Sequence, residues 1–237
     1  MMGCVTSTLT VASIEGTIRS LLPHVAVETR PRSSRTWLEH DLRRELVACI
    51  LGSQVRQEMA VAYTERLETE GLLDDGWWRH GGDDGFALLV RDALQRRTGA
   101  SRVGRYRFPK ARAAHVTRAR DSLARRSLCS RLKEDGPAKD LRRSMIADIS
   151  GLGPKQASMF LRNVGVSYDL AILDVHVLRF MKMRGLLPKE GVHVGTLARY
   201  EKVEEIATAY AGSWGYSVGC FDVAVWATMK AARELRL

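Results

Sequence analysis

Apolar side chains recur along most of the chain with the spacing of an α-helix. The apolar face of a first helix is marked by Leu38, Leu42, Leu46, Cys49 and Ile50. The same pattern predicts further helices over residues 55–67, 86–97, 111–132, 139–148, 154–163, 175–184, 196–211 and 220–237. Strand signals are confined to short pieces such as residues 25–27. We therefore expect a mostly α fold, with a domain over residues 36–237 and an N-terminal segment, residues 1–35, to which the sequence assigns no structure.

Size and composition define the class of protein further. The chain has 237 residues, 45% of them hydrophobic, which is enough for one large domain or two small ones that share a cleft. We expect no membrane span, because no run approaches ~18 consecutive apolar residues. The first twenty residues lack a basic segment followed by an apolar one, so a cytoplasmic location is expected.

The four cysteines, Cys4, Cys49, Cys129 and Cys220, lie too far apart in sequence for a zinc or iron–sulfur motif, so no metal is expected. Cys49 and Cys220 have apolar neighbours, which indicates buried thiols.

The charge balance favours a polyanionic partner. With 37 basic and 27 acidic residues the formal net charge is +10, and nucleic acid is the simplest partner for such an excess. A merely basic, solvated surface is the alternative. Basic residues are dense before and within the helix expected over 111–132: Arg102, Arg105, Arg107, Lys110, Arg112, Arg118, Arg120, Arg125 and Arg126.

The most informative stretch is a short turn between two expected helices. Gly151 and Gly153 permit a tight hairpin, and Pro154 fits the first turn of the helix that follows. Free amides at that helix start can hold a phosphate of the DNA backbone without sequence preference. An ordinary turn between helices that ends on a glycine is the alternative interpretation.

Two residues near this turn are candidates for chemistry. Lys155 lies in the first helical turn, where the helix dipole disfavours a positive charge, so a partly buried amine would lose its proton more readily and become a nucleophile. Asp174 follows nineteen residues later, after an apolar run. The alternatives are a solvated lysine and an aspartate that only caps a helix.

The run GLGPKQASMFLRNVGVSYDLAILDVHVLRF, residues 151–180, resembles the helix–hairpin–helix DNA glycosylase superfamily. It is most similar to the compact second group of 8-oxoguanine DNA glycosylase/AP lyases. In this resemblance Lys155 matches the Schiff-base lysine and Asp174 the catalytic aspartate. It implies a two-part helical fold with the active site in the cleft between helical subdomains, and a helix–hairpin–helix motif at about residues 139–164.

Three other segments carry the resemblance. Residues 46–62 are similar to the helix and turn that face the DNA gap, where Gln54 could fill the vacated stack. Residues 106–113 match the segment whose aromatic stacks on the extruded base, which implicates Phe108. Residues 221–226 resemble the helix that supplies a base-contacting aspartate and a stacking tryptophan, here Asp222 and Trp226.

The resemblance covers the chain from about Trp37 to its end, with one departure. In this group the terminal carboxylate of the chain also reads the base, whereas here the tail, residues 234–237, is longer and ends in leucine rather than lysine.

The resemblance thus implies a bifunctional DNA glycosylase and AP lyase for an oxidised purine, in base excision repair. The base is flipped out of damaged duplex DNA, Lys155 attacks the sugar, and the resulting imine permits strand cleavage by β-elimination. Phosphate contacts are expected from Arg105 and Lys110, and no cofactor is expected. We expect a monomer and assign His176 to a helix surface or cap.

Two alternatives stay open at this point. One is a binding module without turnover, which would need neither Lys155 nor Asp174. The other is a family member that acts on a related modified purine outside duplex DNA.

Overall fold

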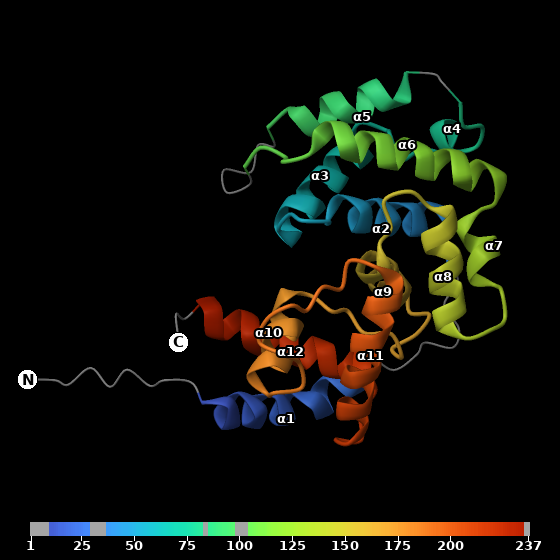
Figure 1. The fold of residues 1–237 in the computed structure, drawn as a ribbon. Coiled ribbons are helices and arrows are strands. Elements are labelled where there is room, and N and C mark those ends of the chain that lie inside the picture. Colours follow the sequence, from blue (N-terminus) through green and yellow to red (C-terminus); the bar gives the residue numbers. More distant parts are fainter. Residues whose placement is uncertain (1–9, 29–36, 83–84, 98–103, 235–237) are drawn as a thin grey trace, which may run out of the picture. The chain divides into compact units, whose positions relative to one another are not determined.

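The computed structural model describes residues 10–28, 37–82, 85–97 and 104–234, and within these ranges all regular structure is helical (Figure 1). The chain divides into two compact units. The terminal unit, residues 1–32 and 167–237, contains α1 (Val11–Glu28), α10 (Val175–Met183), α11 (Leu197–Gly212) and α12 (Val218–Glu234). The central unit, residues 33–166, contains α2 (Glu39–Leu51), α3 (Gln57–Thr69), α4 (Asp75–Trp78), α5 (Phe86–Gln95), α6 (Pro109–Arg125), α7 (Leu128–Leu132), α8 (Ala138–Asp148) and α9 (Pro154–Asn163).

The mostly α prediction is confirmed, with two corrections. The expected helix over 111–132 is wrong as a single element. Helix α6 ends at Arg125, because its C-cap Arg126 has extended backbone, and Ser127 caps the next helix: its hydroxyl accepts a hydrogen bond from Ser130 N at the start of α7. The strand signal at residues 25–27 is also wrong, because these residues belong to α1. There the burial of one helical face outweighs the β propensity of the two valines.

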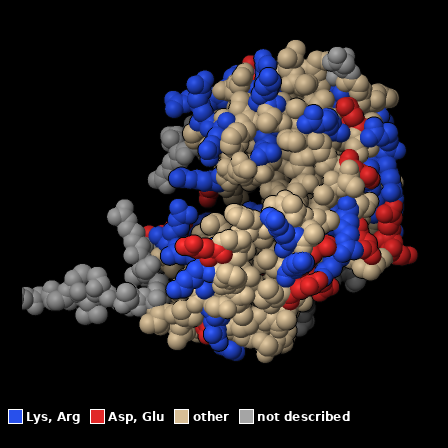
Figure 2. Space-filling view, in the orientation of Figure 1, with Lys and Arg blue, Asp and Glu red and all other residues tan. Residues whose placement is uncertain are grey.

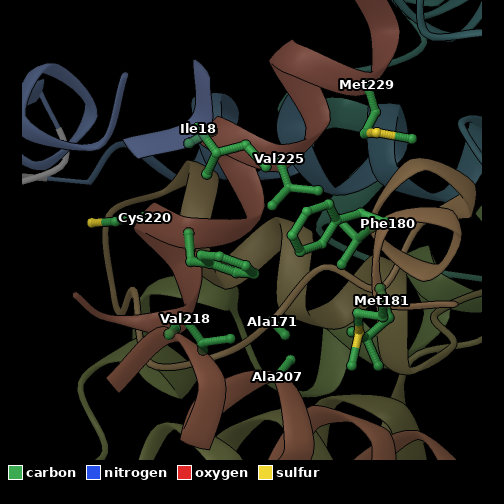
Figure 3. Packing of buried hydrophobic residues seen from close by; sticks show 14 of the residues in the cluster. Ile18, Ala171, Phe180, Met181, Ala207, Val218, Cys220, Val225 and Met229 are labelled. Atoms are coloured by element: carbon green, nitrogen blue, oxygen red, sulfur yellow. The ribbon is translucent and has the colours of Figure 1, made fainter. Parts of the chain in front are cut away.

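The core of the terminal unit joins α1, α10, α11 and α12 (Figure 3). Ile18, Phe180 and Phe221 are fully buried in it. Glu15 joins α1 to its neighbours: it accepts a hydrogen bond from Tyr210 Oη of α11 at 2.6 Å and forms an ion pair with Arg184, the C-cap of α10, at 2.5 Å. Helix α1 is therefore an integral part of this unit, whereas the boundary between residues 1–35 and 36–237 stays a prediction.

The central unit is held by helix pairs and by buried arginines. Helix α2 packs on α3 and α9, α5 packs on α6, and α8 packs on α9. Arg142, which is fully buried in α8, donates to Ser158 Oγ of α9 at 3.1 Å and so ties the two helices together. Arg120 of α6 lies over the Phe86 ring at 4.4 Å, which joins α6 to α5.

Two further expectations concern the interior and the membrane. Cys49 and Cys220 are buried, as their apolar neighbours predict. None of the described helices is long and apolar enough to cross a bilayer.

Candidate active site and nucleic-acid interface

The hairpin between α8 and α9 requires glycine at its first position. Gly151 has φ +90°, a conformation that side-chain-bearing residues rarely adopt. A Cβ atom there would lie 2.9 Å from His115 Cβ and 3.1 Å from Ile50 Cγ2. Gly153 has extended backbone and occupies the N-cap of α9. Glycine is therefore required at position 151 for two reasons: the backbone has a positive φ, and α2 and α6 leave no room for a Cβ atom.

The start of α9 presents free donors. Pro154 has no N–H, and among the described residues nothing accepts from the N–H groups of Lys155 and Gln156. The first amides of a helix that lack a partner, together with the positive end of the helix dipole, attract an anion. The hairpin and the first turn of α9 therefore form a site suited to a phosphate.

Lys155 is partly buried in this first turn, on the helix that packs against α2. Its charge acts on Cys49 of α2. Burial raises the pKa of the Cys49 thiol well above its usual value, the Glu45 carboxylate raises it further, and the positive charge of Lys155 acts in the opposite direction. The positive charge of Lys155 is thus within electrostatic range of Cys49 on α2.

Asp174 is the N-cap of α10, so the helix-capping interpretation is correct. Its Oδ1 accepts from His176 N at 2.8 Å and Val177 N at 2.9 Å. Asp174 is partly buried, and its Oδ2 has no partner among the described residues. One oxygen thus fixes the carboxylate on the helix, while the other can act on a substrate. The backbone N–H of His176 donates to this capping carboxylate, which agrees with the expected place of His176 at a helix cap.

A second cluster in the central unit brings Phe108 close to the turn that contains Gln54. Arg112 donates to Ser53 O at 3.0 Å, and its guanidinium lies 5.9 Å from the Phe108 ring. Phe108 is partly exposed just before α6. Gln54 is exposed and has φ +63°, which among the described non-glycine residues is the single positive value. Such backbone strain is typical of functional positions.

Asp222 and Trp226 lie one turn apart on α12 in the terminal unit. Asp222 is only 2% exposed, and its Oδ2 accepts from Ile172 N at 2.6 Å. Trp226 is partly exposed, with Lys230 Nζ 4.9 Å from its ring centre. A role for Asp222 in contacting a base stays a prediction, but its carboxylate also has a structural role that its spacing to Trp226 does not reveal.

Beside the hairpin the central unit has a basic recess of about 470 Å³. It is lined by Arg118, Asp121, Arg125, Ile146, Ala147, Asp148 and Ser150. Its two carboxylates are paired, Asp121 with Arg120 at 3.3 Å and Asp148 with Arg131 at 2.5 Å. Arg118 and Arg125 form no ion pair with any residue that the structure describes, and Arg118 Nε donates to Ser150 Oγ at 3.1 Å. The recess therefore continues along α6 the surface of the hairpin that is suited to an anion.

The predicted site residues thus fall into two sets. The central unit carries Lys155, Gly151, Gly153, Gln54, Phe108 and the exposed Arg105 and Lys110. The terminal unit carries Asp174, Asp222 and Trp226. Basic side chains are spread over the face shown in Figure 2. The terminal carboxylate and Arg102 lie outside the described residues, and among the described ones no group of three His, Cys, Asp or Glu could hold a metal.

A hairpin between two helices, a lysine at the start of the second and a distal aspartate at a helix N-terminus define a helix–hairpin–helix protein. A sequence profile described as 8-oxoguanine DNA glycosylase matches residues 82–216. The 8-oxoguanine DNA glycosylase/AP lyase of Thermotoga maritima is 39% identical over 194 residues, 81% of this chain and 81% of that protein. The corresponding protein of Picrophilus torridus is 29% identical over 188 residues, 79% and 78% of the two chains. The chain belongs to the 8-oxoguanine DNA glycosylase family.

Solved structures agree with this assignment. The crystal structure of the 8-oxoguanine DNA glycosylase of Thermotoga maritima matches with a TM-score of 0.67 and 29% identity, and covers 91% of this chain and 93% of that chain. An 8-oxoguanine glycosylase/lyase of Methanocaldococcus jannaschii, solved with 15mer DNA containing 8-oxoguanine, matches with a TM-score of 0.61 and 20% identity. That match covers 90% of this chain and 87% of the other, and at this identity it supports the fold alone.

Proposed function

We propose that this protein excises 8-oxoguanine from damaged duplex DNA and cleaves the strand at the resulting abasic site. The observation that carries the proposal is Lys155 in the first turn of α9, directly after the Gly151–Gly153 hairpin, in a chain of the 8-oxoguanine DNA glycosylase family. A module that only bound DNA would need the free amides of the hairpin but no amine beside them.

In the proposed reaction the Lys155 amine attacks C1′ of the sugar. The bond from C1′ to the base breaks, and the base leaves with its bonding electron pair. The carboxylate of Asp174 stabilises the positive charge that develops on the sugar, or takes the proton released by the amine. The C1′–O4′ bond of the sugar ring then breaks. Its electron pair stays on O4′, which gains the proton that the lysine nitrogen loses, and a C=N double bond forms between C1′ and that nitrogen. This imine acidifies the neighbouring C2′–H, and loss of that proton expels the 3′ phosphate by β-elimination. Asp174 is suited to this task because capping occupies only its Oδ1.

The base must first leave the duplex stack, at a cost of a few kcal/mol. We propose that Phe108 and Trp226 stack on the flipped purine, because both are aromatic and partly exposed. Each stacking contact is worth about 1–3 kcal/mol. Asp222 would accept a hydrogen bond from the ring edge. Gln54, which is exposed in the turn after α2, would fill the vacated space.

Borohydride trapping on a duplex with one 8-oxoguanine tests the assignment of the nucleophile. The wild type should form a covalent adduct, and Lys155→Gln should form none while it still binds DNA. Lys133→Gln is the matched control, because Lys133 is exposed and lies at the C-cap of α7, not in the first turn of a helix. Undiminished trapping by Lys155→Gln would contradict the assignment.

The same assay with a panel of duplex and single-stranded substrates identifies the lesion and the form of DNA. Excision confined to single strands or free nucleosides would favour a function outside duplex repair. We also propose a monomeric, cytoplasmic enzyme. Light scattering during gel filtration should give a mass near 26.5 kDa.

A further inference from the structure

The segment just before Asp174 crosses the core of the terminal unit without regular secondary structure. Residues 170–173 lie between 0% and 6% exposed, and Ala171 is in the buried cluster shown in Figure 3. A buried N–H needs an acceptor, and here neither a helix nor a strand supplies one. The acceptors come instead from side chains of α11 and α12.

Two buried carboxylates accept from consecutive amides of this segment. Glu204 Oε1 of α11 accepts from Ala171 N at 2.9 Å, and Asp222 Oδ2 of α12 accepts from Ile172 N at 2.6 Å. Both side chains are almost inaccessible to solvent, at 0% and 2% exposure. Burial of a carboxylate is costly unless it is well hydrogen-bonded. Because two buried carboxylates accept from the adjacent amides of Ala171 and Ile172, the backbone of this segment is held in one conformation.

Tyr200, one turn before Glu204 on α11, completes the set. Its Oη accepts from Leu173 N at 3.0 Å and donates to Ala171 O at 2.8 Å. At the other end of the segment, Gly219 N donates to Tyr168 O at 2.8 Å, and a Cβ on Gly219 would lie only 2.5 Å from that oxygen. Three consecutive N–H groups, those of residues 171–173, are thus held by three side chains from two helices.

We propose that Tyr200, Glu204 and Asp222 form a backbone clamp that positions the carboxylate of Asp174 for base release. The inference rests on the proposed function, in which Asp174 acts on the sugar. Asp174 directly follows the clamped residues, and its own N–H donates to Ile172 O at 2.8 Å. A charged group stabilises a transition state only when it is held in the productive geometry, and a shift of about 1 Å can cost 100-fold in rate. Tyr200 and Glu204 are positioning residues that do not touch the DNA.

Single-turnover kinetics of the full chain on an 8-oxoguanine duplex test the clamp. Tyr200→Phe removes one hydroxyl and should lower the rate constant of base release on the order of 10-fold, with the Kd for DNA unchanged. Glu204→Leu should have a similar effect. Glu204→Gln keeps an oxygen that can accept from Ala171 N and should restore most of the rate. Thr228→Val is the matched control, because it removes a buried hydroxyl whose one hydrogen bond among the described residues is donated to Ala224 O within α12.

A double-mutant cycle separates positioning from general stability. If Tyr200 acts through Asp174, Tyr200→Phe should have little further effect on base release in an Asp174→Asn background. An equal fold-loss in both backgrounds would overturn the inference. So would a fall in rate matched by Thr228→Val.

Amide hydrogen exchange tests the clamp independently of the enzymatic activity. In Tyr200→Phe the amides of residues 171–173 should exchange faster than in the wild type, whereas Thr228→Val should leave them protected. Unchanged exchange in Tyr200→Phe would refute the clamp. A wild type that released no base would refute the proposed function instead, and the exchange result would still decide whether the clamp exists.

Discussion

Replacement of Gly151 by alanine should destabilise the central unit and weaken DNA binding, because two penalties coincide at this residue. Alanine at φ +90° costs about 1–2 kcal/mol relative to glycine. The new Cβ would also approach His115 Cβ at 2.9 Å and Ile50 Cγ2 at 3.1 Å, and both neighbours sit on packed helices. Such overpacking adds about 1–3 kcal/mol. We expect the free energy of unfolding to fall by about 2–5 kcal/mol.

Gly82→Ala separates the two penalties. Gly82 has φ +105° in the same unit, but no atom of the residues that the structure describes lies within 4 Å of its added Cβ. It should therefore lose only the conformational part, about 1–2 kcal/mol. Urea unfolding measures both variants, with a change in midpoint at constant slope taken as a change in stability. Gly151→Ala should also raise the Kd for duplex DNA, because relief of the clash displaces the hairpin. Equal stability and equal DNA affinity of the two variants would refute the argument from packing.

Three other changes give separable readouts. Asp174→Asn should slow base release about 100-fold or more in single-turnover assays, while melting shows little loss of stability, because asparagine caps a helix as well as aspartate does. Arg118→Ala should reduce the slope of log Kobs against log salt by about 0.9 for one lost phosphate contact, measured by fluorescence anisotropy at several salt concentrations. Burial lowers the pKa of His115, with the charges of Arg112 and Arg118 contributing, so below pH ~6.5 the unfolded chain takes up a proton before the folded protein does. Wild-type stability should therefore fall as the pH drops from 7 to 5.5, and His115→Asn should fall less over the same range in urea unfolding.

Local signals were enough to predict most helices. The predicted range 154–163 matches α9, because Pro154 marks its first turn and its apolar face has a regular period. The apolar pattern does not predict the division between α6 and α7, since Leu123, Leu128 and Leu132 continue an almost helical spacing across it. Extended backbone at Arg126 ends α6, and Ser127 caps the start of α7, a local signal that the apolar pattern does not show.

The prediction from sequence leaves helix α1 out, although its apolar residues have helical spacing. Ile14, Ile18 and Leu22 recur every four residues and are buried in the terminal unit. The β-branched residues after Pro23 obscured this pattern, because propensity alone is a weak guide where packing on α12 decides the structure.

The structural role of Asp222 could not be predicted from the sequence. Its place one turn before Trp226 could suggest a base-reading role, because helical spacing is a local property. Its hydrogen bond to Ile172 N joins residues fifty positions apart, and only the fold brings them together. The same holds for Tyr200 and Glu204, whose sequence context is that of ordinary helix residues although both hold the backbone that leads to Asp174. Nucleophile and carboxylate could thus be found by local pattern and resemblance, whereas the residues that hold the carboxylate in place are defined by tertiary structure.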